Sequence, residues 1–420
     1  MSAQLPREAL AASEWVLTST EAEETQLYWR LGALHAERTA ETVNRELLLY
    51  RDIDGQRGSA SAYLAGDASD GERVKTALTA ASLALNPPYR LPQGPASYSA
   101  LELGAAHMPD REQLVAWQAA VREEIERSGA KASHLELFAG RHTTRVEASN
   151  ERRHAWQSDH FLLDLVVSAG EGDESTEFRL MRASRLLDGL LPAAVLERAL
   201  QAVRDRKGAK LPPTGRMPVV LPASELATLL RAVDVHTNGQ FVVTGMLQKK
   251  VGDALIESEG DPITIAGDAT LPYAVASAPT DSSTVPARRL ELLDRGVIRN
   301  MHSDAQFAAY LGVEPTGPLG SLVWTPGSTS AADLFGDGPV LEVLAFSANM
   351  PDPMTGAFAA EIKMGYLHQG GARIPVAQGS VTGNVFEALR NCRLSRETEE
   401  HEGYFGPSQV RFEQLQVAGE

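Results

Sequence analysis

A segment rich in proline and glycine near the middle of the chain limits most strongly how the chain can fold. It runs from Lys207 to Pro218 and also contains Gly208, Pro212, Pro213 and Gly215. Proline fixes φ and removes a backbone donor, and glycine weakens regular structure, so neither a helix nor a central strand is expected to cross this segment. The segment therefore predicts a boundary between two domains, which we place at residues 1–210 and 217–420.

The N-terminal half is expected to combine strands with helices. Residues 5–18 indicate a helix and residues 25–39 a strand, and residues 46–50 and 58–64 continue the strand pattern around a turn at Asp54-Gly55. Three further extended segments predict an antiparallel meander with a turn at residues 170–173: residues 133–148, 152–169 and 175–183.

Helix start and stop signals separate these strands. Ser69 and Glu72 form a capping-box pattern before a helix expected to reach Leu85, and Asp110 caps a second helix that ends at Gly129. Pro192 is typical of the first turn of a third helix, which runs to about residue 206. These helices are expected to pack on the sheet.

The C-terminal half is expected to be rich in β-structure. A short strand at residues 219–221 precedes a helix at 224–235, and residues 239–300 indicate short strands joined by turns. Pro351, Pro353 and Gly356 force a tight loop between two apolar runs, and Gly370-Gly371 indicates a hairpin. Asn384 is a good N-cap for a helix at 385–391. The fold class is therefore predicted as α+β, with an N-terminal α/β domain of helices on a sheet and a β-rich C-terminal domain.

Charge and cysteine content narrow the classes of function. The formal net charge is −16, which makes a nucleic-acid or anionic-membrane surface unfavourable. The single cysteine, Cys392, excludes an internal disulfide and a cysteine-rich zinc site, and we expect a structural thiol. The first residues lack the pattern of a signal peptide, and no apolar run approaches the roughly 20 residues of a spanning helix. A cytoplasmic protein is expected.

Common catalytic motifs are absent from the sequence. It contains no HExxH, GxSxG, Walker A or GxGxxG pattern, so the metallopeptidase helix, serine hydrolase, P-loop and Rossmann interpretations lose their main support. One alternative remains open: His142, Glu151, His154, Asp159 and His160 could supply metal ligands if neighbouring strands brought them together, although a solvated face of the meander is favoured.

Several motifs in the C-terminal half occur in an order that resembles the TldD/PmbA family, and within it the TldE (PmbA) branch. They are the loop from Ser347 to Gly356, the hairpin from Gly365 to Val376, the Gly383-Asn384 helix start and the Tyr404 to Ser408 segment. The resemblance implies a two-domain subunit. In the TldD branch, HExxH and a later cysteine hold zinc, and that subunit pairs with a TldE-like subunit to cleave unfolded or leader peptides.

This chain departs from the TldD pattern at each zinc ligand. The segment from Ser224 to Asp234 stands where the zinc helix would be and contains no histidine, and Tyr404 to Pro407 stands where the cysteine would be. The resemblance therefore implies a non-catalytic TldE-like subunit with no metal or other cofactor of its own, whose partner is a TldD-like zinc subunit and whose ligand is an unfolded peptide. The alternative is a homodimeric peptide-binding protein without catalytic activity.

The same motifs suggest residues that contact peptide or partner. They are Ser347, Asn349, Thr355, Gly356 and Asn384, and no catalytic or metal-ligating residue is assigned. The competing interpretation is that these polar and turn residues satisfy backbone groups within the loop.

Overall fold

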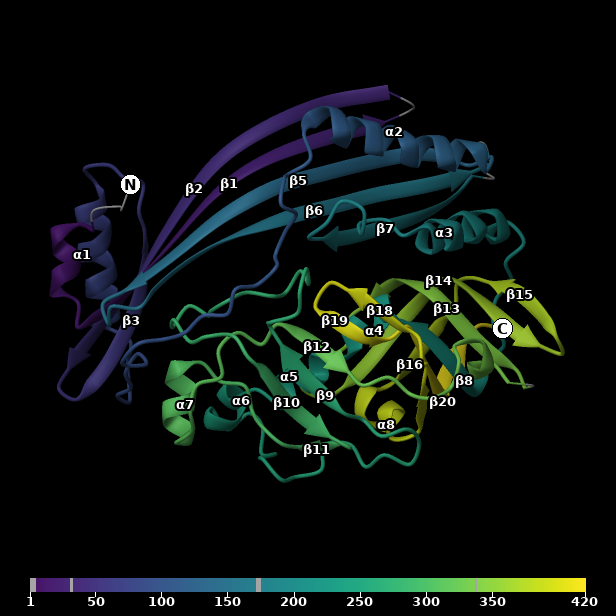
Figure 1. Ribbon diagram of the computed structural model, residues 1–420. Helices are drawn as coiled ribbons and strands as arrows, with labels where there is room; N and C mark the ends of the chain where they lie inside the picture. The colour runs from purple at the N-terminus through teal and green to yellow at the C-terminus, as the bar shows by residue number, and fades with distance from the viewer. Residues whose placement is uncertain (1–4, 31–32, 171–174, 337) are drawn as a thin grey trace.

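The computed structural model describes residues 5–30, 33–170, 175–336 and 338–420. Figure 1 shows the long, curved strands of an N-terminal sheet arching over a C-terminal part that contains two further sheets. The N-terminal sheet has seven strands in the order β4-β3-β2-β1-β5-β6-β7. They are β1 (Glu14–Arg30), β2 (Ala33–Ile53), β3 (Gln56–Tyr63), β4 (Leu85–Asn86), β5 (Lys131–Ala148), β6 (Arg153–Ala169) and β7 (Thr176–Ser184).

Every pairing in this sheet is antiparallel. The predicted meander and the turn at Asp54-Gly55 are confirmed by β5 to β7 and by the β2–β3 hairpin. The expected helices on a sheet are present, but the antiparallel pairing differs from the parallel strands that a strict α/β domain would have. The predicted turn at 170–173 falls largely on residues 171–174, which lie outside the described residues.

The helices of the N-terminal part are α1 (Asp70–Ala81), α2 (Arg111–Arg127) and α3 (Ala193–Arg206). Leucines of α2 and α3, such as Leu114 and Leu200, share one buried cluster with Leu137 and Leu163 of the sheet. Figure 1 shows α2 and α3 beside the strands β5 to β7, while α1 lies at the opposite end near β3.

The caps of these helices only partly match the prediction. Asp110 caps α2 through a complete capping box with Gln113, and Gly129 follows the helix with φ of 81°. The predicted box at α1 is wrong, because Ser69 makes no capping bond and donates its hydroxyl to Asp67 instead. α1 also ends at Ala81, before the predicted end at Leu85.

The helix predicted for residues 5–18 is wrong beyond its first turns. A short 3-10 helix, η1 (Arg7–Ala11), is followed directly by β1, which pairs with β2 and β5 along its length. The strand predicted at 25–39 is two strands, because β1 ends at Arg30 and β2 begins at Ala33. Residues 31–32, between them, lie outside the described residues. Pairing on both sides of β1 outweighs the local helical pattern.

The second sheet has the order β11-β10-β9-β12-β19-β18. Its strands are β9 (Ile265–Asp268), β10 (Arg289–Asp294), β11 (Val297–Ile298), β12 (Ser321–Trp324), β18 (Thr398–His401) and β19 (Tyr404–Pro407). The third sheet has the order β13-β8-β20-β16-β14-β15, and β14 also pairs with β13, so the path from β13 to β14 closes into a barrel. Its strands are β8 (Gly215–Pro222), β13 (Val340–Asn349), β14 (Ala357–Gln369), β15 (Ala372–Val376), β16 (Ser380–Asn384) and β20 (Gln409–Ala418), with β17 (Cys392–Leu394) paired to β20.

Short helices connect these strands. They are α4 (Ala223–Leu229), α5 (Arg231–His236), α6 (Gly239–Val243), α7 (Ala305–Leu311), the 3-10 turn η3 (Ala332–Leu334) and α8 (Val385–Arg390). The helix predicted at 224–235 is thus divided at Leu230, and α6 occupies the start of the region expected to hold only short strands. The hairpin at Gly370-Gly371 and the cap at Asn384 are confirmed, because Asn384 Oδ1 accepts from the backbone N of Phe386 and Glu387.

The two halves of the chain share a core. Met364 and Tyr366 of β14 belong to the buried cluster that joins the N-terminal sheet to α2 and α3. The Tyr366 hydroxyl donates to Asp205 of α3 over 2.8 Å, and Arg185 donates to the backbone carbonyls of Ala274, Val275 and Ser277. The α+β class is confirmed, and the domain boundary between residues 210 and 217 stays a prediction.

Within the described ranges, no helix is both long enough and apolar enough to cross a membrane.

Candidate functional site

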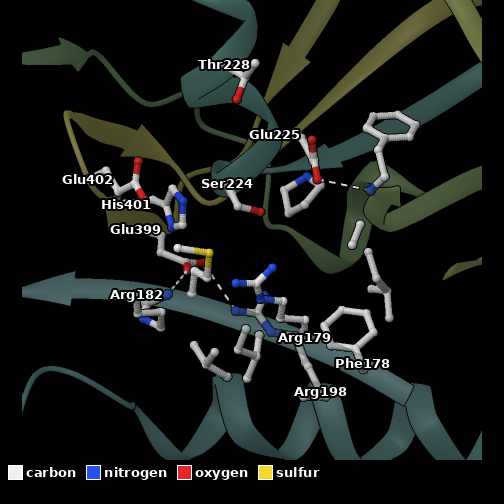
Figure 2. A pocket seen from close by; sticks show the side chains of 18 of the residues that line it. Phe178, Arg179, Arg182, Arg198, Ser224, Glu225, Thr228, Glu399, His401 and Glu402 are labelled. Atoms are coloured by element: carbon white, nitrogen blue, oxygen red, sulfur yellow. Dashed lines mark hydrogen bonds and ion pairs between the residues drawn. The ribbon is translucent and has the colours of Figure 1, made fainter. Parts of the chain in front are cut away.

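A cleft of about 310 Å³ lies between the N-terminal sheet and the C-terminal part. We call it the interdomain cleft. Strand β7 and helix α3 form one wall, and α4, β13 and the end of β18 form the other (Figure 2). Its polar and charged lining residues include Arg179, Arg182, Arg198, Ser224, Glu225, Thr228, Glu399, His401, Glu402 and Gln409.

Helix α4 places two kinds of side chain on opposite faces. Leu226 and Leu229 are buried in the core of the C-terminal part. Ser224, Glu225 and Thr228 line the interdomain cleft instead (Figure 2). Helix α4 therefore buries one face in the core and turns the other toward the interdomain cleft.

Glu225 connects the cleft wall to the loop that the sequence singled out. Its carboxylate accepts from the backbone N of Phe346 at 3.1 Å and from Asn349 Nδ2 at 2.8 Å. Burial raises the pKa of Glu225, and these two hydrogen bonds oppose that rise only in part. The Glu225 carboxylate thus holds β13 where its pairing with β14 is irregular, between Val343 and Ala348.

Ion pairs cross the cleft between segments that lie far apart in the sequence. Arg182 of β7 and Arg198 of α3 both face Glu399 of β18, with N–O distances of 3.6 and 3.4 Å. The Arg182 side chain is 13% exposed and that of Glu399 22%, so this contact is screened less than a surface pair. Arg182 also donates to the carbonyl of Leu190. These contacts tie the edge strand β18 to the N-terminal sheet.

His401 adds a second titratable group to the cleft. Burial lowers the pKa of His401, so the neutral imidazole is favoured near neutral pH. Glu402, which follows it, has φ of 51° in the turn between β18 and β19. The neutral imidazole and the Glu225 carboxylate give the cleft polar groups that can accept hydrogen bonds.

The predicted contact residues fall into two places. Asn349 lies behind the cleft wall, bonded to Glu225, and its Oδ1 atom is buried without a hydrogen-bond partner. Ser347 is exposed on β13, one residue beyond Phe346, which lines the cleft. None of the five predicted residues is itself among those that line the cleft.

Thr355, Gly356 and Asn384 come together at the start of α8. Asn384 Nδ2 donates to the carbonyl of Thr355 at 2.7 Å, and the backbone N of Val385 donates to the carbonyl of Gly356 at 2.8 Å. Thr355 Oγ1 donates to Asp352 at 2.7 Å. These bonds satisfy backbone groups of the loop and the helix start, and a contact of these residues with peptide or partner stays a prediction.

Among the described residues the alternative metal cluster does not form, because His142, Glu151, His154, Asp159 and His160 do not supply three ligand atoms within 4.8 Å of one another. Asp159 is buried and held by two bonds from Arg141, at 2.6 and 2.9 Å. The rings of His142 and His160 stack with centroids 6.2 Å apart, and His154 stacks on Tyr98. The face of the meander that we expected to be solvated therefore carries stacked rings and a buried ion pair.

A zinc ion does not fit the described residues of the interdomain cleft. Glu225, Glu399, His401 and Glu402 do not supply three ligand atoms within 4.8 Å of one another. A group that meets this spacing lies elsewhere, on the N-terminal sheet, and consists of His134, Glu136 and Asp164.

The structure agrees with the expected structural thiol at Cys392. Cys392 is fully buried, and burial raises its pKa to about 12. The arginines and glutamates of the cleft were missed, because they lie in ordinary amphipathic strands and helices or, for Glu402, in a turn. Only the position of Glu225, at the start of the segment that resembles the zinc helix, could have marked it.

The fold and the cleft define an α+β protein in which an antiparallel sheet and a closed barrel enclose a charged groove. Residues 214–419 match the profile of the PmbA/TldA metallopeptidase C-terminal domain. The chain belongs to the TldD/PmbA family.

Curated relatives match over part of their length. A metalloprotease of Archaeoglobus fulgidus is 25% identical over 264 residues, which cover 57% of this chain and 60% of that protein. A zinc metalloprotease TldD homolog of Saccharolobus solfataricus is 22% identical over 256 residues, or 55% of this chain and 56% of that protein. The chain therefore aligns with somewhat more than half of the length of these two relatives.

A solved structure matches over nearly the whole chain. TldE from Thermococcus kodakarensis has a TM-score of 0.82 and 19% sequence identity, with 99% of both chains covered. At this identity the similarity establishes the fold, and it extends through the N-terminal sheet as well as the C-terminal part.

Proposed function

We propose that this chain is the TldE-like, non-catalytic subunit of a heterodimeric TldD/TldE zinc metallopeptidase that cleaves unfolded or leader peptides. One observation carries the proposal. The helix that resembles the zinc helix turns Ser224, Glu225 and Thr228 toward the interdomain cleft, and none of these is an imidazole. The zinc ion, which activates water for peptide hydrolysis, then belongs to a TldD-like partner.

The cleft suits an extended peptide. β7 is the last strand of the N-terminal sheet and β18 the last strand of the second sheet, so each has one neighbour in its sheet. Both contribute residues to the cleft. An extended chain can add to such an edge through main-chain hydrogen bonds, which demand little of its sequence. In this proposal the chain holds and orients the peptide, and the partner cuts it.

The balance of charge in the cleft supports binding of main chain rather than of one charged side chain. Arg182 and Arg198 are satisfied by Glu399, and Glu225 is satisfied by two protein donors. Ser224 and Thr228 offer hydroxyl groups beside them. The presence of a single cysteine in the chain fits a reducing compartment, and we place the complex in the cytoplasm.

The test is a cleavage assay with four arms. The purified chain, a TldD-like partner, their mixture, and the mixture with a zinc chelator are each incubated with an unfolded peptide. We expect cleavage only by the mixture without chelator. Cleavage by this chain alone, unaffected by the chelator, would overturn the proposal. A chain that forms a stable homodimer and binds the peptide, with no effect of the partner, would favour the alternative function, a homodimeric peptide-binding protein.

Paired variants locate the function in the cleft. Arg182→Gln removes the inner contact with Glu399, and Arg122→Gln on α2 serves as a control with a partly exposed arginine remote from the cleft. We expect the first to weaken peptide binding by the mixture several-fold and the second to leave it unchanged. Equal behaviour of the two variants would argue against the cleft as the binding site.

A further inference from the structure

A cluster of potential metal ligands lies on the N-terminal sheet, outside the interdomain cleft. His134 and Glu136 are two residues apart on β5 and therefore point to the same face, and Asp164 of β6 stands directly opposite Glu136. His134 Nε2 lies 3.2 Å from Glu136 Oε1 and 4.0 Å from Asp164 Oδ2. One ligand atom from each residue falls within 4.8 Å of the others.

The cluster is held rigidly and is partly shielded from water. Both strands are interior to the sheet, β5 between β1 and β6, and β6 between β5 and β7. The side chains of His134, Glu136 and Asp164 are 21%, 16% and 14% exposed. One imidazole nitrogen and two carboxylate oxygens form a donor set that suits Zn²⁺ and similar divalent transition metals.

Two arginines at present balance the charge of the carboxylates. Arg179 of β7 makes two bonds to Asp164, at 2.8 and 2.6 Å, and Arg30 lies 3.8 Å from Glu136. Arg179 is 53% exposed, so its side chain has room to leave Asp164. A bound cation would take over the role of Arg179 as the positive partner of that carboxylate.

We propose that His134, Glu136 and Asp164 form a binding site for a divalent transition metal ion, and that the ion competes with Arg179 for Asp164. Arg179 also lines the interdomain cleft. Occupation of the site therefore releases a guanidinium group toward the cleft, where it can bind a carboxylate of a peptide. The metal has a regulatory role here and no role in hydrolysis.

The metal-binding half of this proposal does not rest on the proposed function, because it is tested on the chain alone. Tag-free protein is titrated with ZnCl₂ in a calorimeter, and the metal bound after dialysis is measured by elemental analysis. The variants are His134→Ala, which removes the nitrogen ligand, and Arg179→Gln, which removes the competing cation. His35→Ala on β2 is the control, because His35 is an exposed histidine outside the cluster.

We expect about one Zn²⁺ per chain, binding at least tenfold weaker in His134→Ala and about tenfold tighter in Arg179→Gln. The control should match the wild type, and thermal unfolding should show that every variant is folded. Zinc binding that His134→Ala does not weaken overturns the site. If Arg179→Gln binds zinc more weakly than the wild type or equally well, the metal does not compete with Arg179. Loss of the positive charge beside Asp164 must favour binding of the metal ion if the two compete.

The coupling to the cleft is tested with an acidic and a neutral peptide of equal length. Zinc should tighten binding of the acidic peptide by the wild type and leave the neutral peptide unaffected. In Arg179→Gln, zinc should affect neither peptide. If zinc changes the binding of both peptides equally, or still changes peptide binding by Arg179→Gln, the Arg179 guanidinium does not couple the metal site to the cleft. Failure of peptide cleavage with a partner would leave these binding results unchanged, so the two proposals fail separately.

Discussion

Replacing Glu225 tests the link between the cleft wall and β13, which leads into the loop from Ser347 to Gly356. The carboxylate of Glu225 accepts from Phe346 N and Asn349 Nδ2, and both donors belong to β13. Glu225→Ala removes both acceptors. Glu225→Gln keeps the size of the side chain and one acceptor, but turns an amide NH₂ toward one of the two donors.

The size of the effect follows from these two bonds. Hydrogen bonds to a charged group contribute about 1.5–3 kcal/mol each, so two bonds set an upper limit of roughly 3–6 kcal/mol. Burial offsets part of that, because it raises the pKa of Glu225 despite both bonds. Water from the cleft can also reach donors that lose their partner. We therefore expect Glu225→Ala to lower the free energy of unfolding by about 2 kcal/mol, and Glu225→Gln by roughly half of that.

The raised pKa fixes the sign of the pH dependence. The native state holds the Glu225 proton more tightly than the unfolded chain, whose glutamate pKa is about 4.3. The stability that this proton contributes is fully present below the unfolded pKa and is lost as the pH rises through the native pKa. The wild type should therefore lose stability relative to Glu225→Gln as the pH rises from about 4.3 toward neutrality, and the difference should then stay constant.

Calorimetric unfolding between pH 4 and pH 8 measures both effects. At neutral pH the alanine variant should unfold about 4–8 °C below the wild type. Glu123→Gln on the exposed face of α2 is the control and should follow the wild type at every pH. A wild type that gains stability over Glu225→Gln as the pH rises would refute the argument that burial dominates at this carboxyl. An alanine variant as stable as the wild type would refute the role of the two bonds.

Three further predictions concern residues outside the cleft. At pH 8 the thiol of Cys392, whose pKa burial raises to about 12, should resist iodoacetamide in the native protein because only roughly one molecule in ten thousand carries the thiolate; mass spectrometry should find labelling only after denaturation, and rapid native labelling would contradict this. Gly356→Ala should lower Tm more than Gly370→Ala. Both glycines have positive φ, but a Cβ at Gly356 would meet a phenylalanine ring at 2.7 Å, while a Cβ at Gly370 would meet nothing within 4 Å. We expect the two free energies of unfolding to differ by about 1–3 kcal/mol, and equal losses would contradict the prediction. Arg57→Met should lower the free energy of unfolding by about 3–5 kcal/mol, because Arg57 is fully buried and its loss leaves the buried Glu14 without its cation. Thermal unfolding measures this loss, and the double variant Arg57→Met, Glu14→Leu should regain stability. A double variant that regains none would count against the ion pair.

Local signals predicted the elements whose stability is local. Asn384 caps α8 because its side chain reaches backbone donors two and three residues away, and the Gly370-Gly371 turn joins two strands that are adjacent in the chain. The capping box at Asp110 is of the same kind. All of these depend on atoms within a few residues, which the sequence order itself brings together.

The predictions that went wrong depend on distant partners. Residues from Glu14 onward form a strand because β1 pairs with both β2 and β5, and β5 begins only at Lys131. The predicted 224–235 helix is also divided, at Leu230, whose side chain is buried in the core of the C-terminal part. Local propensity predicts the conformation of a segment poorly when pairing with neighbouring strands determines it.

The sequence by itself determined the β-rich character of the C-terminal half with its Gly370-Gly371 hairpin and its Asn384 cap, and the missing histidines in the segment that resembles a zinc helix. Only the tertiary structure decided which polar groups meet. Glu225 reaches Asn349, Arg182 reaches Glu399, and Asp164 stands between His134 and Arg179. The physical reason is that alternation along a strand specifies which face a side chain occupies but not which strand will lie beside it.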